Sequence, residues 1–155
     1  MTNFSSKLNA IARNTDLYLK SVFSKQNSKS HLIKPMKYGV FSGGKRFRSA
    51  IVVNTGKIYG ISYKKLITIG AAVECLHSYS LMHDDLPSMD NDDLRRGRPS
   101  THKKFNEFTA ILAGNSLFTL AFEILSGSDL KVSQKIKTEL IRVLSNSSGH
   151  SGLTG

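Results

Sequence analysis

The 155-residue chain is poor in cysteine, in long apolar runs and in acidic residues. Its only cysteine, Cys75, lies in an apolar stretch, so an internal disulfide is excluded and a reducing compartment is expected. No run approaches the roughly 18 uninterrupted apolar residues that a membrane span needs, and residues 1–23 lack the apolar block of a secretory signal. We therefore expect a cytoplasmic protein with no membrane span.

Basic residues outnumber acidic ones, since 22 Lys and Arg face 11 Asp and Glu for a formal net charge of +11. This balance favours a polyanionic partner, and nucleic acid, an anionic membrane or a phosphorylated small molecule would each fit. A nucleic-acid-binding module is disfavoured because the basic residues are dispersed and no recognition motif appears. The composition, 39% apolar and 21% charged, is typical of one globular domain.

Helical periodicity recurs along the chain, whereas no segment alternates apolar and polar residues over the length of a strand. We therefore predict an all-α fold. Its helices are expected over residues 4–22, 47–60, 63–86, 105–125 and 132–144. Ser62 is a candidate N-cap, and Pro87 should break the helix that ends near it. Glycines three apart in residues 149–155 suggest close packing against a segment that this chain does not contain, so the chain is expected to be incomplete.

Five of the eleven acidic residues lie within ten positions, at Asp84, Asp85, Asp90, Asp92 and Asp93. Carboxylates crowded this tightly repel one another unless water solvates them or a cation lies between them. Oxygen ligands without a Cys/His set favour Mg²⁺, with Mn²⁺ also fitting, and the spacing does not match a calcium loop. Mg²⁺ also binds phosphate oxygens, which suits a phosphorylated substrate. A solvated acidic loop is the alternative.

His77 lies seven residues before Asp84, which places the two about 20° apart and about 10 Å along a helix. They should therefore face one cavity, although a core histidine is the alternative interpretation of His77. Asp90 does not follow this register, so the chain must deform between Asp85 and Asp90.

The string Gly43-Gly44-Lys45-Arg46-Phe47-Arg48 opens another predicted helix. Lys45 and Arg48 would lie about 60° apart on that helix, so both could reach one anion near its N-terminus. Arginine grips phosphate oxygens bidentately, and lysine acts as a point charge. A solvated basic helix start explains the same string equally well.

Taken together, these motifs and Arg95-Arg96-Gly97 resemble the short-chain trans-prenyl diphosphate synthases, and most closely their bacterial farnesyl diphosphate synthase members. Residues 74–87 match that pattern nearly residue for residue. The resemblance implies an antiparallel helical bundle of the isoprenoid synthase type. Residues 1–155 would be the N-terminal half of a single polyprenyl synthase domain, so the bundle is incomplete in this chain.

The resemblance also implies a magnesium-dependent prenyltransferase, which would be a homodimer when full length. It would condense isopentenyl diphosphate with dimethylallyl or geranyl diphosphate to make farnesyl diphosphate. A geranylgeranyl diphosphate synthase, or a truncated partner of a full-length synthase without catalytic activity, are the alternatives. Residues 1–155 alone should be inactive, because a second aspartate-rich motif of the family lies beyond them.

Site roles follow from the resemblance, position by position. Asp84 and Asp90 resemble the magnesium-binding carboxylates, which Asp85 supports, and Arg95 resembles the arginine on the allylic diphosphate. Asp84, Asp90 and Arg95 would thus be the catalytic residues. The set that resembles the isopentenyl diphosphate site is Lys45, Arg48, His77 and Arg96. Tyr79, five residues before Asp84, resembles the aromatic floor that limits product length.

Overall fold

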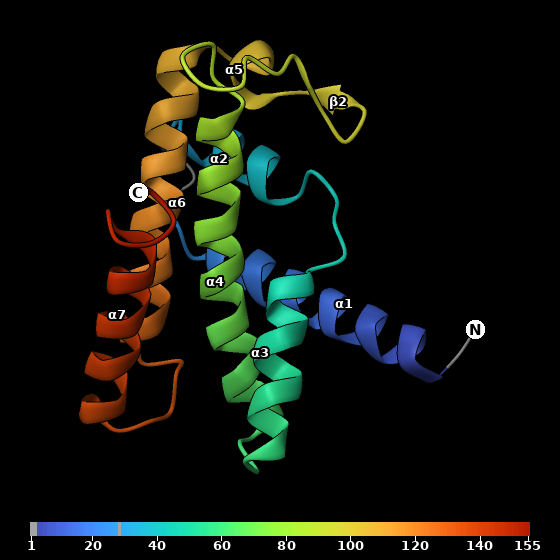
Figure 1. The fold of residues 1–155 in the computed structure, drawn as a ribbon, viewed down its shortest axis with the longest axis vertical. Coiled ribbons are helices and arrows are strands. Elements are labelled where there is room, and N and C mark those ends of the chain that lie inside the picture. The colour runs from blue at the N-terminus through green and yellow to red at the C-terminus, as the bar shows by residue number, and fades with distance from the viewer. Residues whose placement is uncertain (1–2, 28) are drawn as a thin grey trace.

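The computed structural model describes residues 3–27 and 29–155, and helices account for most of them (Figure 1). The long helices are α1 (Asn3–Ser24), α3 (Phe47–Ile58), α4 (Tyr63–Asp84), α6 (Glu107–Ser126) and α7 (Gln134–Ser148). The shorter elements are α2 (Ile33–Val40), α5 (Thr101–Lys104), and the strands β1 (Leu94–Arg95) and β2 (Arg98–Pro99). The predicted all-α class is confirmed, while α2, α5 and the small hairpin were not predicted.

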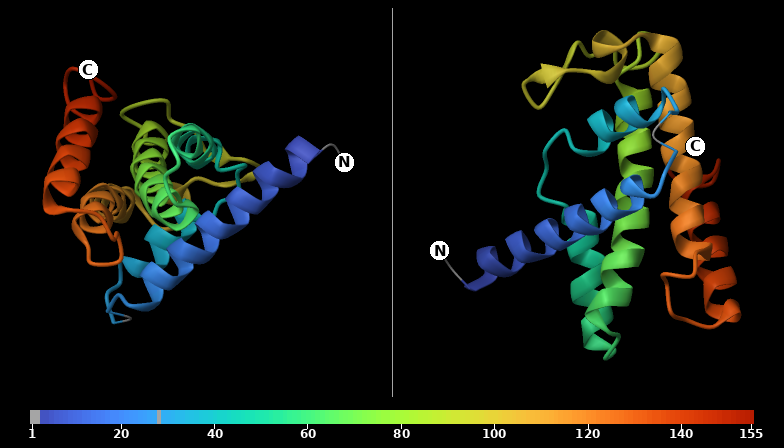
Figure 2. Two further views of the ribbon diagram at one scale, coloured as in Figure 1. Left: turned by 90° about the horizontal axis from the view of Figure 1, so that it is seen from below. Right: turned by 180° about the vertical axis from the view of Figure 1, so that it is seen from behind.

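Helix α4 is the central element, and it contacts α1, α2, α3 and α6. Helices α3, α4, α6 and α7 alternate in direction, and α1 crosses α3 and α4 obliquely on one side (Figures 1 and 2). Small residues let α4 and α6 approach closely: a Cβ at Gly114 would lie only 2.5 Å from Nε2 of His83. This close approach occurs next to the acidic segment at the end of α4.

Two apolar clusters hold the helices together, and α1 contributes to both. Ile11 belongs to the smaller cluster, with Val53 of α3. Leu19 belongs to the larger one, which also contains Leu117 of α6. Each fully buried leucine contributes about 1.5–3 kcal/mol relative to an exposed one. Not every apolar residue of α1 is buried, since Leu17 is exposed.

The boundaries of α4 are close to the predicted ones. Ser62 occupies the N-cap position, with extended backbone angles, but its side chain makes no capping hydrogen bond. The helix ends at Asp84, two residues before the predicted end, because the chain turns there into the acidic segment. Residues 149–155 form turns rather than continuing a helix.

Within the described residues, α6 is long and apolar enough to cross a membrane by length and composition. Core helices of soluble proteins pass the same test, and α6 packs against α2, α4, α5 and α7. The weak signal is consistent with a core helix, and the expectation of no membrane span stays a prediction.

Candidate functional site

The three basic residues of the 43–48 motif do not point the same way: one side chain is buried and two are exposed. Arg46 adopts a left-handed backbone (φ 49°), and its side chain is buried. Lys45 and Arg48 are exposed. Because Lys45 precedes α3, the predicted 60° offset between Lys45 and Arg48 does not apply. The left-handed residue, rather than helix geometry, is what turns Arg46 away from its basic neighbours.

Arg48 and His77 meet across the α3–α4 contact. The Arg48 Nη1 atom lies 3.1 Å from His77 Nε2, and because a guanidinium can only donate, His77 Nε2 accepts. Burial, reinforced by the positive charges of Arg48, Arg96, Arg46 and Arg95, lowers the pKa of His77 to about 4. At neutral pH His77 is therefore an uncharged hydrogen-bonding group among arginines.

The β1–β2 hairpin sends Arg95 and Arg96 in different directions. Its register pairs Arg95 with Arg98, which leaves Arg96 and Gly97 as a two-residue turn with positive φ angles of 53° and 74°. This combination is typical of a type I′ turn. Arg96 lies against the other loop, since a Cβ at Gly44 would be 2.1 Å from its Nη1 atom. We call Arg48, His77 and Arg96, together with the exposed Lys45 that follows Gly44 in the chain, the basic cluster.

The acidic segment after α4 folds back on the end of that helix. The Asp90 N–H donates to the Asp84 carbonyl at 2.8 Å, and the Asp92 N–H donates to the Asp85 carbonyl at 3.1 Å. The deformation predicted at Pro87 is therefore present. It returns Asp90 to the level of Asp84. We call residues 84–93 the acidic turn.

Asp84 and Asp85 have opposite environments within the acidic turn. Asp85 is buried and accepts hydrogen bonds from Nε and Nη2 of Arg95, the former at 2.8 Å. Asp84 is half-buried; burial, and then the negative charge of Asp90, raise its pKa above the usual value. Asp85 is thus already neutralised by an arginine, whereas Asp84 and Asp90 repel each other.

The donor set of the acidic turn fits a divalent cation that shares its shell with a ligand. In residues 3–27 and 29–155, no three His, Cys, Asp or Glu side chains gather closely enough to hold a metal by themselves. Mg²⁺ commonly takes only one or two carboxylates and fills its shell with waters and phosphate oxygens. The repulsion between Asp84 and Asp90 is the kind that such a cation relieves.

Tyr79 and Asp84 line a cavity of about 620 Å³ beside the acidic turn. The Tyr79 ring packs edge-on against His83 and Phe118, with centroid distances of 4.6 and 5.1 Å. The sequence predicted that His77 and Asp84 face one cavity, but in the structure they line two different ones. His77 lines a smaller cavity of about 200 Å³, and Ser80 and Leu153 line both.

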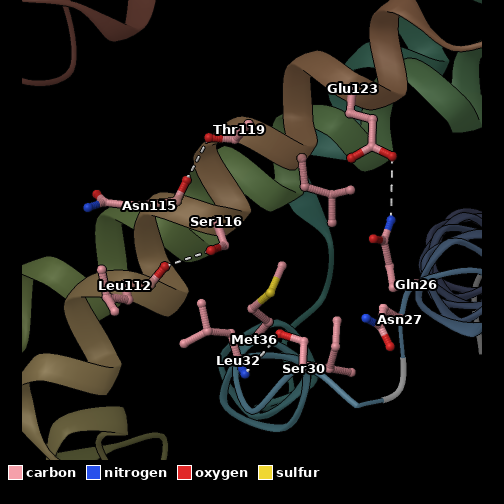
Figure 3. A pocket seen from close by; sticks show the side chains of 12 residues that line it. Gln26, Asn27, Ser30, Leu32, Met36, Leu112, Asn115, Ser116, Thr119 and Glu123 are labelled. Carbon is pink, nitrogen blue, oxygen red and sulfur yellow. Dashed lines mark hydrogen bonds between the residues drawn. The ribbon is translucent and has the colours of Figure 1, made fainter.

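A further cavity, of about 390 Å³, lies between α2 and α6 (Figure 3). Met36 of α2 lines it from one side, and Leu112, Asn115, Thr119 and Glu123 of α6 line it from the other (Figure 3). The Thr119 hydroxyl donates a hydrogen bond to the Asn115 backbone carbonyl, and the Gln26 side-chain amide donates one to the Glu123 carboxylate. None of the predicted site residues lines this cavity.

Two buried charged residues next to the basic cluster were not predicted to matter. Arg46 is 5% exposed and Glu74 is 2% exposed. Glu74 did carry a signal: it is the one charged residue in the otherwise uncharged stretch 66–76, and a buried charge needs a partner.

Comparison with known proteins places this geometry in context. The Polyprenyl synthetase family model matches residues 29–151. A farnesyl diphosphate synthase of Escherichia coli is 50% identical over 125 residues, which are 80% of this chain and 42% of that protein. Geranylgeranyl pyrophosphate synthase 4 of Arabidopsis thaliana is 45% identical over 77% of this chain and 32% of its own length.

Solved structures agree with the family match. A crystal structure of a geranyltransferase from Legionella pneumophila superposes with a TM-score of 0.93 and 38% identity, covering 99% of this chain and 55% of that one. The chain therefore spans about half the length, or less, of the proteins that it matches.

Proposed function

Because the chain belongs to the polyprenyl synthetase family, we propose that its complete gene product makes farnesyl diphosphate. The reaction joins isopentenyl diphosphate to dimethylallyl or geranyl diphosphate. The allylic C–O bond breaks and diphosphate leaves, the isopentenyl double bond attacks the allylic carbon, and a proton is lost. Two diphosphates must therefore be held close together, one as a leaving group and one as an anchor.

A single observation carries this proposal: the β1–β2 hairpin connects the acidic turn to the basic cluster. Arg95, in β1, bonds to Asp85 in the acidic turn. Arg96, the next residue, lies against Gly44 beside the basic cluster. The positive charges of both lower the pKa of His77. Contact of one short turn with both regions supports a site in which the carboxylate pair and the basic cluster act on neighbouring diphosphates.

The residues divide into two binding sets under this proposal. Asp84 and Asp90 would hold Mg²⁺, or Mn²⁺, on the allylic diphosphate, with Arg95 beside them. The bound ion would neutralise the leaving group as a Lewis acid. The basic cluster would hold the diphosphate of isopentenyl diphosphate, where the arginine grips phosphate oxygens and the neutral imidazole contributes a hydrogen bond. The apolar cavity below would keep water from the allylic carbon.

Tyr79 supports farnesyl over longer products. Its ring lines the large cavity, and Phe118 packs behind it. A growing prenyl chain that starts at Asp84 would meet this aromatic pair. We infer that the pair stops elongation at fifteen carbons, the length of the product named above.

We also propose a homodimer in the cytoplasm. The free thiol of Cys75 is fully buried, and burial raises its pKa to about 12, which suits a reduced and unreactive cysteine. The dimer is proposed by analogy with the family.

The test is chain elongation by the purified complete gene product. Supplied with isopentenyl diphosphate, geranyl diphosphate and Mg²⁺, it should release farnesyl diphosphate, identified by mass spectrometry. Chelation with EDTA should abolish the product. Absence of any elongated product under these conditions would refute the proposal. A parallel assay of residues 1–155 alone should show no turnover.

A further inference from the structure

A buried polar network lies directly beneath the basic cluster, and none of its members belongs to the proposed binding sets. It consists of Thr15 and Asp16 of α1, Arg46 and Ser49 at the start of α3, and Glu74 of α4. Asp16 alone among these is partly exposed. Buried charges and hydroxyls of this kind are retained only when they are paired.

Arg46 directly precedes α3, and its side chain connects this position to three other helices. Its Nε donates to Asp16 Oδ1 at 2.8 Å, and its Nη2 donates to the Val40 carbonyl, at the end of α2, at 2.7 Å. Its Nη1 lies 3.7 Å from Glu74 Oε2. One guanidinium therefore holds a left-handed backbone position against α1, α2 and α4.

Glu74 fixes the first turn of α3 from outside that helix. Its Oε1 accepts the Ser49 N–H at 3.0 Å, which satisfies one of the N–H groups that a helix start leaves unpaired. The Ser49 hydroxyl in turn lies 2.7 Å from the Thr15 hydroxyl. Gly70 lets the two helices meet here, because a Cβ at that position would lie 2.3 Å from Ser49 Oγ. Position and direction of the α3 start are thus set by side chains rather than by apolar packing alone.

The network and the basic cluster share the same two stretches of backbone. Glu74 and His77 lie three residues apart on α4, about one helical turn. Arg46 stands between Lys45 and Arg48 in the chain. Any shift of the α3 start therefore moves Arg48 relative to His77, which it now meets at 3.1 Å.

We propose that Glu74 and Arg46 are positioning residues for diphosphate binding by the basic cluster. They do not touch the ligand. They hold the start of α3 so that Lys45 and Arg48 face the ligand together with His77. The inference rests on the proposed function for the identity of the ligand, isopentenyl diphosphate. Buried ion pairs add little stability compared with apolar residues of the same size, so a role in geometry is a physical reason for keeping this one.

The test compares Glu74→Gln and Arg46→Lys in the complete gene product. The glutamine keeps the shape and one acceptor for Ser49 but loses the charge, and the lysine keeps the charge but loses the three-way fork. Thr68→Val is the matched control, because Thr68 is equally buried on α4, and its hydroxyl bonds to the Lys64 carbonyl and to Tyr18 rather than to a member of the network. Melting temperatures confirm that each variant is folded at the assay temperature.

Two measurements report on positioning. Calorimetry with inorganic pyrophosphate in EDTA measures binding that needs no metal, and steady-state kinetics give the KM for each substrate. Glu74→Gln should weaken pyrophosphate binding and raise the KM for isopentenyl diphosphate at least about fivefold, since small displacements of binding groups have large effects. The KM for geranyl diphosphate should stay within about twofold, and Thr68→Val should change neither constant.

The outcomes separate this inference from the proposed function. If Arg48→Ala weakens pyrophosphate binding but Glu74→Gln and Arg46→Lys do not, the network is merely structural and the inference is overturned. It is also overturned if Arg48→Ala has no effect, because there is then no cluster to position. If the wild-type protein fails to elongate prenyl chains while Glu74→Gln still weakens pyrophosphate binding, the proposed function fails and the inference stands.

Discussion

The basic cluster and the acidic turn are built on the same plan with opposite charges. In each, exposed or half-buried charges stand next to a buried residue of the same type that is already paired. Arg46 is neutralised by Asp16 and Glu74, and leaves Arg48 for a ligand. Asp85 is neutralised by Arg95, and leaves Asp84. Within a repeated motif, burial therefore distinguishes the structural charge from the binding charge.

The two regions differ in how firmly they are held. The network around Arg46 connects α1, the end of α2, α3 and α4, and its Arg46–Glu74 pair is almost fully buried. The Asp85–Arg95 pair connects only the end of α4 to a hairpin, and the Arg95 side chain is 27% exposed. The basic cluster is therefore prebuilt, whereas the acidic turn keeps two carboxylates whose repulsion the proposed cation would relieve.

The largest effect should come from removing a charge that the acidic turn offers to a cation. In the complete gene product, Asp84→Asn should lower kcat/KM for chain elongation about a thousandfold, the upper end of the range for losing one electrostatic contact in a transition state. Steady-state kinetics with saturating geranyl diphosphate and varied isopentenyl diphosphate would measure this kcat/KM.

Asp93→Asn is the control for that measurement. Asp93 belongs to the same turn, but its side chain is exposed and pairs with Lys103 on the surface. Its activity should stay within about threefold of wild type, since exposed pairs contribute little. Equal losses in both variants would mean that the turn acts only through its net charge.

A second experiment tests the difference in firmness directly. Arg46→Met leaves Glu74 buried and unpaired, and should lower the free energy of unfolding by about 3–5 kcal/mol. Arg95→Met should lower it by only about 1–2 kcal/mol, because the Arg95 side chain is partly exposed and water can enter its place beside Asp85. Urea denaturation followed by circular dichroism gives both values, and equal losses would show that the two regions are held alike.

Sequence alone was sufficient for the parts of this comparison that depend on local pattern. The apolar runs predicted α4 and α6, and Pro87 predicted that the chain would deform between Asp85 and Asp90. The return of the acidic segment to the end of α4 was not predicted. The division of roles within each motif was not predictable in this way. Nothing in the order Lys45-Arg46 says which side chain is buried, since that follows from a left-handed backbone at Arg46, stabilised by residues of α1 and α4.

The hairpin escaped prediction for a related reason. Its turn requires a positive φ at Arg96, a conformation that a non-glycine residue rarely adopts without support from its surroundings. Glu74, by contrast, could have been recognised as a charge in an uncharged stretch, although its partner became evident only once α3 was packed on α4. Tertiary contacts, rather than local propensity, decide such positions.

A smaller effect is expected at Tyr79, the proposed aromatic floor for product length. In the complete gene product, Tyr79→Ala should shift the main product from fifteen to twenty carbons, with a change in kcat of less than about tenfold. Tyr79→Phe, which keeps the ring against Phe118, is the control and should leave the product unchanged. Liquid chromatography of the dephosphorylated products reads out both. Unchanged fifteen-carbon output from Tyr79→Ala would exclude Tyr79 as the floor.

The smallest predicted effect is a pH dependence that belongs to the basic cluster alone. Burial and four arginines lower the pKa of His77 to about 4 from its usual 6.5. Between these values the unfolded chain binds a proton that the folded chain does not, so the folded state loses stability as the pH falls. The contribution of neutral His77 is complete above about pH 6.5 and is lost on the way down to pH 4.

Comparing wild type with His77→Asn isolates the pH dependence of stability that is due to His77. The raised pKa of Asp84 has the opposite sign, because its folded form binds protons more readily, but it is common to both proteins. Between pH 7 and pH 5 the wild type should lose about 1 kcal/mol more unfolding free energy than the variant, after allowance for solvent screening. Parallel urea curves at the two pH values measure the difference. If the two proteins lose equal amounts, His77 is not held neutral by burial among its arginines, and the basic cluster is less firmly prebuilt than the buried network beneath it implies.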